Sequence, residues 1–248
     1  MKIFVAKDAG YCFGVRDAVN LAHTTAKKYG NVYMLGDIVH NENVVKNLEN
    51  SGTKVVQLLE EVPKDKPVLF RAHGTANQVW QKAKERNIKI IDATCPLVQE
   101  IHDEVFKLEE EGRRIIIIGD HGHDEVVGIA SQVANPIVIE NPGEAKEIKK
   151  IKKAGIVSQS TQTIENVQEI INILMTKIFD LRFVNTICYP TKRNQSQIKE
   201  LARLCDVVLI IGSFTSANSK RLSQLSTMRN PNSHQITSAK DICPDWFL

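Results

Sequence analysis

The sequence predicts an α/β protein in which three related units with mostly parallel sheets surround a shared centre. Short β-branched runs alternate with amphipathic segments along all 248 residues, a pattern typical of βαβ units. Cys12, Cys95 and Cys188 each follow an apolar run and precede a helical pattern. Recurrence at a long, nearly constant period is typical of an internal structural repeat.

Strand and helix candidates alternate from the N-terminus onward. The short apolar runs that predict strands are 2–6, 31–35, 67–70, 88–92, 113–118, 136–140, 154–157, 181–185 and 206–212. The segments with helical periodicity are 13–29, 76–86, 97–111, 164–178 and 194–204. No Pro- or Ser-rich linker separates them, so we expect the units to pack tightly.

Each unit is expected to begin directly after one of the three cysteines. The predicted units are 13–95, 96–188 and 189–248, with an N-terminal strand within 1–12 completing the third. The residues 28 positions after the cysteines are His40, His123 and Ser216. The first two periods span 83 and 93 residues, but the third has only 72 even with 1–12 included. The sequence therefore predicts that the third unit is incomplete at its C-terminus and lacks its last polar loop.

Composition and charge exclude several classes of protein. The net charge is +3, and basic residues are interspersed with acidic ones, so nucleic-acid binding is not indicated. The longest apolar runs, 115–118 and 207–211, are far shorter than the ~18 residues of a membrane span. The N-terminus has no signal-peptide pattern. We expect a cytoplasmic protein that binds neither membrane nor nucleic acid.

The repeated cysteines predict a metal centre. Parallel α/β sheets bind ligands beyond the carboxyl ends of their strands, where Cys12, Cys95 and Cys188 are expected to converge. Three thiolates without a fourth suit an iron-sulfur cluster with one open iron better than a structural zinc, which usually has four ligands. A free cysteine is more often a small apolar core residue. That is the expectation for Cys205 and Cys243, which lie outside the repeat.

Histidines and a glutamate occupy the polar loops after the other strands. His40, His73 and His123 offer N–H donors for an anion, and Glu125 offers a carboxyl group for general acid catalysis. A zinc site formed by His121, His123 and Glu125 is the alternative. That segment lacks the HExxH spacing of a helical zinc site and is expected to form an irregular loop.

Ser216 and Asn218 lie where a helix is expected to begin after the strand at 206–212. Backbone N–H groups at a helix N-terminus, joined by these side chains, form a phosphate cradle, although simple N-capping explains the same residues. Ser160 and Thr161 lie in a similar position before the helix at 164–178. These loops predict a small phosphorylated substrate, and reduction of a phosphate ester is the reaction that fits best.

Eight motifs indicate one family. They are AGYCFGVRDAV, VHNENVV, RAHG, DATCPLV, GHDEVVG, SQST, CYPTKRNQ and SANSKRL, in this order over essentially the whole chain. In these motifs the chain resembles the LytB family of 4-hydroxy-3-methylbut-2-enyl diphosphate reductases, oxidoreductases of the last step of the non-mevalonate route of isoprene biosynthesis. The resemblance implies a trefoil of three α/β domains around a 4Fe-4S cluster. It also implies reductive loss of the allylic hydroxyl group, giving isopentenyl and dimethylallyl diphosphates.

The resemblance further implies a role for each candidate residue. The cluster would be bound by Cys12, Cys95 and Cys188, and the proton donor would be Glu125. The substrate would be held by His40, His73, His123, Ser160, Thr161, Ser216, Ala217 and Asn218. Two of these, Ser160 and Thr161, would relay protons near the substrate hydroxyl group. Reduced ferredoxin or flavodoxin would supply the electrons.

Three departures from the family pattern are visible. Ser160 stands where the family usually has threonine, and it keeps the hydroxyl group. Ala217 stands where the family has a second serine, so one side-chain donor to the diphosphate is absent. The family continues beyond Leu248 into a Gly-Ala-Ser loop, so the resemblance predicts a C-terminally truncated chain.

Three hypotheses remain open at this point. The first is an active iron-sulfur reductase. The second is a truncated, catalytically weak member of the same family that binds a cluster or a diphosphate. The third is a zinc-stabilised binding scaffold, which predicts a colourless protein that contains zinc in place of iron and sulfide.

Overall fold

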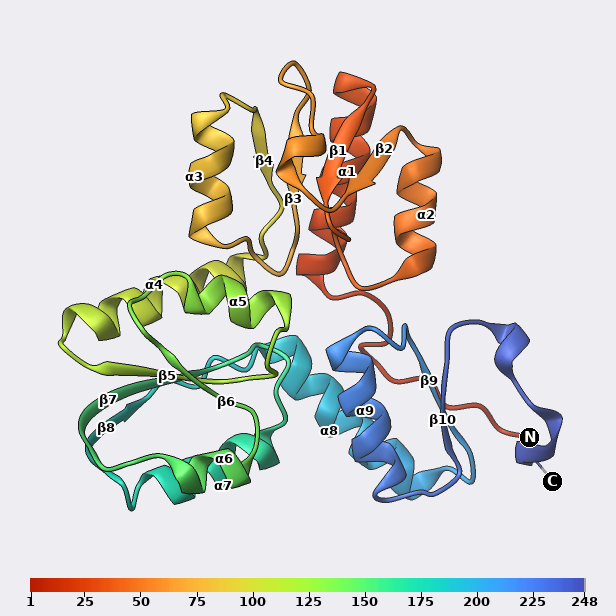
Figure 1. Cartoon of the computed structure of the whole chain (residues 1–248). Helices are drawn as coiled ribbons and strands as arrows, with labels where there is room; N and C mark the ends of the chain where they lie inside the picture. Colours follow the sequence, from red (N-terminus) through yellow and green to blue (C-terminus); the bar gives the residue numbers. More distant parts are fainter. Residues whose placement is uncertain (248) are drawn as a thin grey trace.

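The computed structural model describes residues 1–247 and consists of three α/β units around a common centre (Figure 1). Two units contain a four-stranded sheet and the third contains a two-stranded sheet. All strand pairs are parallel, which confirms the predicted α/β class and trefoil arrangement. No helix within residues 1–247 is long and apolar enough to cross a membrane.

The first unit has the strand order β2-β1-β3-β4. Its elements are α1 (Phe13–Tyr29), β1 (Val32–Leu35), α2 (Glu42–Asn50), β2 (Thr53–Val56), the 3-10 turn η1 (Leu59–Glu61), β3 (Val68–Phe70), α3 (Asn77–Glu85) and β4 (Ile90–Asp92). Alternate residues of β3 face opposite sides of the sheet. Leu69 therefore joins the core beneath α1 and α2, whereas Val68 and Phe70 join the core beneath α3.

The second unit repeats this order as β6-β5-β7-β8. Its elements are α4 (Pro96–Glu110), β5 (Arg114–Ile118), α5 (Asp124–Ala130), β6 (Ile137–Ile139), α6 (Pro142–Glu147), β7 (Ile151–Ser158), α7 (Ile164–Leu174) and β8 (Ile178–Phe183). The apolar run in β5 serves both faces. Ile115 and Ile117 pack under α4 and α5, and Ile116 and Ile118 pack over α6 and α7, as expected for a strand buried between two helical layers.

The third unit is smaller within the described residues. Its elements are α8 (Tyr189–Leu204), β9 (Val208–Ile211), α9 (Ala217–Thr227), β10 (Ser233–Ile236) and the 3-10 helices η2 (Ala239–Asp241) and η3 (Pro244–Phe247). Its strand order, β10-β9, corresponds to the pairs β2-β1 and β6-β5 in the other two sheets. Ala202, Val208 and Ile210 form a small core on one side, while Ile211 is 75% exposed.

The expected N-terminal strand does not form. Residues 1–12 lie along the third unit without sheet pairing (Figure 1), and Ile3 and Val5 are both at least three-quarters exposed. In the first two sheets the fourth strand pairs only with the third strand. Residues 1–247 supply no third strand beside β9, so the position that the fourth strand takes in the other two sheets has no neighbouring strand here. Residues 1–12 therefore do not complete the third sheet as a paired strand in this structure.

Polar contacts cross each seam between the units. Arg71 pairs with Asp124 between the first and second units, Arg221 pairs with Asp120 between the second and third, and Ser213 donates to Glu42 between the third and first. Five of these six side chains lie in loops or first helical turns, and Arg221 lies in the second turn of α9. The contacts therefore hold the inner ends of the units together.

Candidate active site

Cys12, Cys95 and Cys188 hold the same structural position in the three units. Each is the N-cap residue of a helix, respectively α1, α4 and α8, and none uses its side chain to cap that helix. All three thiols are free. Because the N-terminus of a helix carries partial positive charge, it stabilises a thiolate or another anionic group that lies close to it.

Several contacts bring these helix starts together. A Cβ atom on Gly14 of α1 would lie 2.4 Å from the Cys95 Sγ, so the first and second helix starts nearly touch. The rings of Phe13 and Tyr189, which directly follow two of the cysteines, stack with centroids 5.8 Å apart. The repeat therefore places the thiols where the sequence predicted, at one centre.

The pKa values of two of these thiols depend on burial and on neighbouring charges. Burial raises the pKa of Cys95, with further increases from Cys12 and Cys188. Burial also raises the pKa of Cys188, and the charges of Glu125 and Cys12 add to the effect. A bound cation would reverse this effect, because metal ligation favours the thiolate form.

The donor set fits a cluster better than a single ion. Within residues 1–247 no group of His, Cys, Asp and Glu is compact enough to hold one metal ion. In an iron-sulfur cluster each cysteine binds a separate iron, so the sulfur atoms lie farther apart than the ligands of a single ion. Three free, partly buried thiols at three helix N-termini fit such an arrangement.

The alternative zinc site is not assembled. His121 is exposed, and its Nε2 lies 2.8 Å from the Glu144 Oε2 at the surface. Glu125 is buried and bonds in the opposite direction, to Ser160. The segment is also not an irregular loop as expected, because the Nδ1 of His123 accepts the Glu125 N–H and caps the helix α5.

Glu125 is a buried carboxyl group held by one neighbour. It is 1% exposed. The Ser160 backbone N–H donates to Oε1, and the Ser160 Oγ donates to Oε2 at 2.7 Å. Burial raises the pKa of Glu125, which outweighs the opposing effect of the Ser160 hydrogen bonds. A carboxyl group with a raised pKa can carry and deliver a proton near neutral pH.

Thr161 lies beside this acid with its hydroxyl oxygen already used as an acceptor. The Gln159 Nε2 donates to the Thr161 Oγ1 at 3.0 Å, and the Arg221 Nη1 donates to it at 3.1 Å. A hydroxyl group has one donor and two acceptor positions. The Thr161 O–H is therefore left free to donate to a ligand.

The three predicted histidines form one cluster. The His40 and His73 rings stack with centroids 4.1 Å apart, and the His123 ring lies 5.4 Å from His40 and 5.9 Å from His73. Burial lowers the pKa of each, to about 4 for His123. The rings are therefore neutral near pH 7 in the free protein. An anion bound among them would favour their protonated forms.

Polar atoms without partners mark where a ligand fits. Among the described residues, the Nε2 of His40, the Nδ1 of His73 and the Oδ1 of Asn218 are buried and make no hydrogen bond. Such atoms are uncommon in folded proteins and are usually satisfied by a ligand or water. The Asn218 amide can turn either end toward a ligand.

The N-terminus of α9 completes the candidate site. Ser216 is its N-cap and accepts the Ser219 N–H at 3.3 Å, and Ala217 is the first helical residue. The Ser213 hydroxyl group bonds to Glu42, two residues after His40, which brings this loop next to the histidine cluster. The N–H groups of the first helical turn, including that of Ala217, have no partner within the helix and can bind an anion.

Residues missed in the sequence support this arrangement. They are Glu42, Arg71, Gln159, Asp120, Asp124 and Arg221. Arg221 is 8% exposed and links Thr161 to Asp120. Most of them lie within or beside quoted motifs, and Asp120 follows the buried strand β5, so their position at the carboxyl ends of strands was the available signal.

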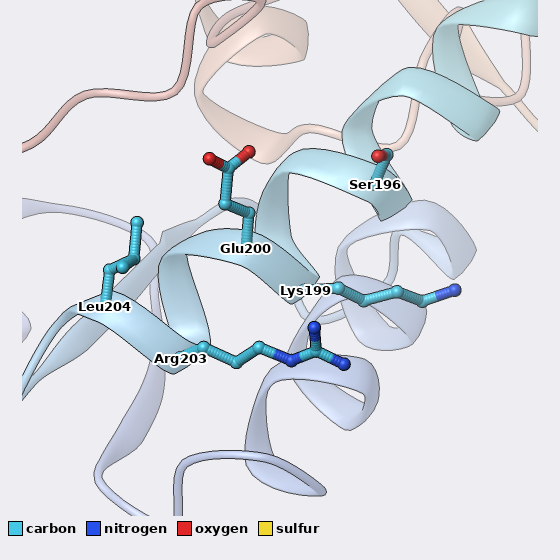
Figure 2. A pocket seen from close by; sticks show the side chains of 5 residues that line it. All are labelled: Ser196, Lys199, Glu200, Arg203 and Leu204. Atoms are coloured by element: carbon cyan, nitrogen blue, oxygen red, sulfur yellow. The ribbon is translucent and has the colours of Figure 1, made fainter.

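A shallow hollow of about 370 Å³ lies apart from this site on the surface of α8 (Figure 2). Its lining residues are Ser196, Lys199, Glu200, Arg203 and Leu204. It contains none of the candidate residues, and Lys199 already pairs with Glu165. We assign it no part in the chemistry of the site.

A sequence model of the LytB protein family matches residues 3–248. The chain is 38% identical to a 4-hydroxy-3-methylbut-2-enyl diphosphate reductase from Geobacter metallireducens and 36% identical to one from Geobacter sulfurreducens. Each alignment covers all of this chain and 88% of the relative.

Solved structures give the same result. The E-1-hydroxy-2-methyl-but-2-enyl-4-diphosphate reductase from Plasmodium falciparum superimposes with a TM-score of 0.92 at 29% identity, covering 95% of this chain and 76% of that one. An (E)-4-hydroxy-3-methyl-but-2-enyl diphosphate reductase, described as the terminal enzyme of the non-mevalonate pathway, superimposes with a TM-score of 0.72 at 35% identity. That match covers 99% of this chain and 89% of the other.

Gly14→Ala should disturb the cysteine centre. Alanine favours the helix, but its Cβ would lie 2.4 Å from the Cys95 Sγ and displace it. We expect several-fold less iron per chain after anaerobic reconstitution, measured against Asn20→Ala at an exposed position of the same helix. Equal iron content in the two variants would contradict the close approach.

His123→Asn should reduce the sensitivity of the ligand-free protein to acid. The folded-state pKa of His123 is about 4, below its ordinary value of 6.5, so the folded state binds fewer protons between these values and loses stability as the pH falls. Asparagine can still accept the Glu125 N–H but does not titrate. Denaturant unfolding at pH 7 and pH 5 should show the wild type losing roughly 2 kcal/mol more than the variant. Equal losses would remove His123 as a source of acid sensitivity.

Proposed function

Because the chain belongs to the LytB protein family, we propose that it reduces (E)-4-hydroxy-3-methylbut-2-enyl diphosphate to isopentenyl and dimethylallyl diphosphates. One observation carries the proposal. The buried acid Glu125 is linked to the cysteine centre through Ser160, which donates hydrogen bonds to both Glu125 oxygens and whose main-chain carbonyl accepts the Cys188 N–H at 3.0 Å. Reductive removal of a hydroxyl group needs electrons and protons at one place, and this geometry provides for both.

Cys12, Cys95 and Cys188 would bind a 4Fe-4S cluster. A protein that provides three ligands, where electron-transfer ferredoxins provide four, leaves one iron without a protein ligand. Such a cluster would supply the two electrons of the reaction when bound. The partial positive charges of three helix N-termini would stabilise the anionic cluster and its ligands.

His40, His73, His123 and Asn218 would bind the diphosphate group, with the first turn of α9 and the Ser216 hydroxyl group. The support is the clustering of the histidines and the buried, unpartnered nitrogen and oxygen atoms of His40, His73 and Asn218. Neutral histidines donate one N–H each, and they gain a proton more readily once an anion is bound. The Ala217 N–H would serve where a side-chain hydroxyl group is absent.

Glu125 would supply the proton to the leaving hydroxyl group. In the overall reaction the allylic C–O bond breaks, the oxygen leaves as water, and a new C–H bond forms, which consumes two electrons and two protons. Ser160 would orient Glu125 by bonding both of its oxygens. Thr161, whose O–H is free to donate, would pass protons between the acid and the substrate hydroxyl group.

The electrons would come from a small acidic carrier such as reduced ferredoxin or flavodoxin. The net charge of +3 is compatible with such a partner. We propose the cytoplasm as the compartment, because all five cysteines are free thiols, which is typical of a reducing environment.

An anaerobic assay tests the proposed function. The protein is reconstituted with iron and sulfide, analysed for both elements, and supplied with the allylic diphosphate and a one-electron reductant. We expect a brown protein that releases isopentenyl and dimethylallyl diphosphates. A brown protein that binds diphosphate without turnover would indicate a binding role, and a colourless protein containing zinc would exclude the reductase.

Glu125→Gln should separate cluster binding from proton delivery. Glutamine keeps the shape, and its single oxygen can accept the Ser160 N–H while its NH2 group donates to the Ser160 Oγ, but it has no acidic proton. We expect unchanged iron and sulfide content and a loss in kcat of roughly 10²- to 10⁴-fold. Val127→Ala, at an exposed position of the same helix, is the control. Unchanged reduction kinetics in the glutamine variant would exclude Glu125 as the acid.

A further inference from the structure

His102 of α4 has no role in the chemistry described above, yet three parts of the site meet at its ring. It follows Cys95 by seven residues, or about two turns of the same helix. A Cβ on Gly74 would lie 3.1 Å from its Cε1 and 3.3 Å from its Nε2, and a Cβ on Gly128 would lie 3.6 Å from the Nε2. The imidazole therefore lies between the loop after His73 and the helix that carries Glu125.

Gly74 makes room for this ring, whereas a Cβ on Gly128 would make only an ordinary van der Waals contact with it. Gly74 has a φ of +86°, a conformation that residues with a Cβ rarely adopt. A side chain there would also press on the imidazole and on Val98. The loop that carries His73 therefore needs a glycine at this position, both for its turn and for its close approach to α4.

The Nε2 of His102 is a buried polar atom without a partner. Burial lowers the pKa of His102, so the ring is neutral and carries one N–H. The same hypothetical Cβ atom on Gly128 would lie 3.6 Å from the His102 Nε2 and 3.7 Å from the main-chain carbonyl oxygen of His73. The ring nitrogen and this carbonyl therefore border the same point, and they make no hydrogen bond with each other in the ligand-free protein.

The other edge of the ring faces a different environment. His102 is half-buried and lines a hollow of about 400 Å³ between the first and second units, together with Trp80 and Asp92. The Nδ1 is not among the buried unpartnered atoms, so water in this hollow can satisfy it. With water donating to the Nδ1, the ring proton lies on the Nε2.

We propose that His102 is a positioning residue for diphosphate binding, whose Nε2–H bonds the main-chain carbonyl of His73 when the ligand is bound and so fixes the His73 imidazole against the diphosphate. The inference rests on the proposed function, because it takes His73 as a diphosphate ligand. A donor that is unsatisfied in the free protein and satisfied in the complex strengthens ligand binding. Mutation of His102 should therefore change affinity rather than the chemical step.

Four variants of the cluster-loaded protein test this. His102→Leu fills the space without a donor, His102→Gln places an N–H near the Nε2 position, and His102→Asn places one near the Nδ1 position. Glu100→Gln, at an exposed position of the same helix, is the control. The probe is inorganic diphosphate, with affinity measured by calorimetry, and KM and kcat are measured with the allylic substrate.

The leucine and asparagine variants should bind diphosphate roughly five- to tenfold more weakly, with KM raised and kcat within about threefold. The glutamine variant should remain within about twofold of the wild type. If leucine prevents folding, the comparison of glutamine with asparagine carries the test. Equal affinities in all variants, or a loss in kcat alone, would overturn the proposal.

A double-mutant cycle with His73→Ala separates positioning from general packing. If His102 acts through His73, adding His102→Leu to His73→Ala should weaken diphosphate binding by less than twofold. Additive losses would overturn the proposal even if each single variant binds weakly. If the wild type binds diphosphate and the His102 variants bind it equally well, only this inference is refuted. If the wild type binds no diphosphate, the proposed function is refuted as well.

Discussion

The convergence of three helix N-termini on one point is the constraint on which the rest of the structure depends. Each cysteine is an N-cap, so each sheet must direct the carboxyl ends of its strands inward. The strand order β2-β1-β3-β4 recurs as β6-β5-β7-β8 because the same geometry is required each time. Polar pairs at the three seams, such as Arg71 with Asp124, hold the inner ends in register. Gly14 allows the final approach, since any larger residue would meet the Cys95 sulfur.

A centre built this way contains polar groups that cost free energy in the absence of ligands. Burial raises the pKa of Glu125 and lowers the pKa of His123, opposite directions with one cause, the loss of water around a charge. These are the shifts that a proton donor and a neutral anion receptor need. The buried, unpartnered atoms of His40 and Asn218 likewise lower the stability of the ligand-free protein, but they are available to bind a ligand.

Much of the fold and of the candidate site could be predicted from the sequence, and each feature that could not be predicted has a physical reason. The repeat placed Cys12, Cys95 and Cys188, because strand length and helix length fix where each loop emerges. It did not reveal the short helix that begins after His123, because seven residues are too few for a clear helical period. The strand expected at 2–6 had a suitable composition, but a strand needs a neighbouring edge, which composition does not show. Arg221 and His102 were not identified because their roles depend on contacts between units.

We propose that Cys12, Cys95 and Cys188, and only those three cysteines, bind an iron-sulfur cluster at the centre of the fold. The most direct measurement is the iron and sulfide content of the anaerobically reconstituted protein and of its single Cys→Ser variants. We predict about four irons and four sulfides per chain in the wild type. We also predict a large loss in each of the variants at Cys12, Cys95 and Cys188, with wild-type content in those at Cys205 and Cys243. Full content in a variant at any of the first three, or loss at either of the last two, would contradict the claim.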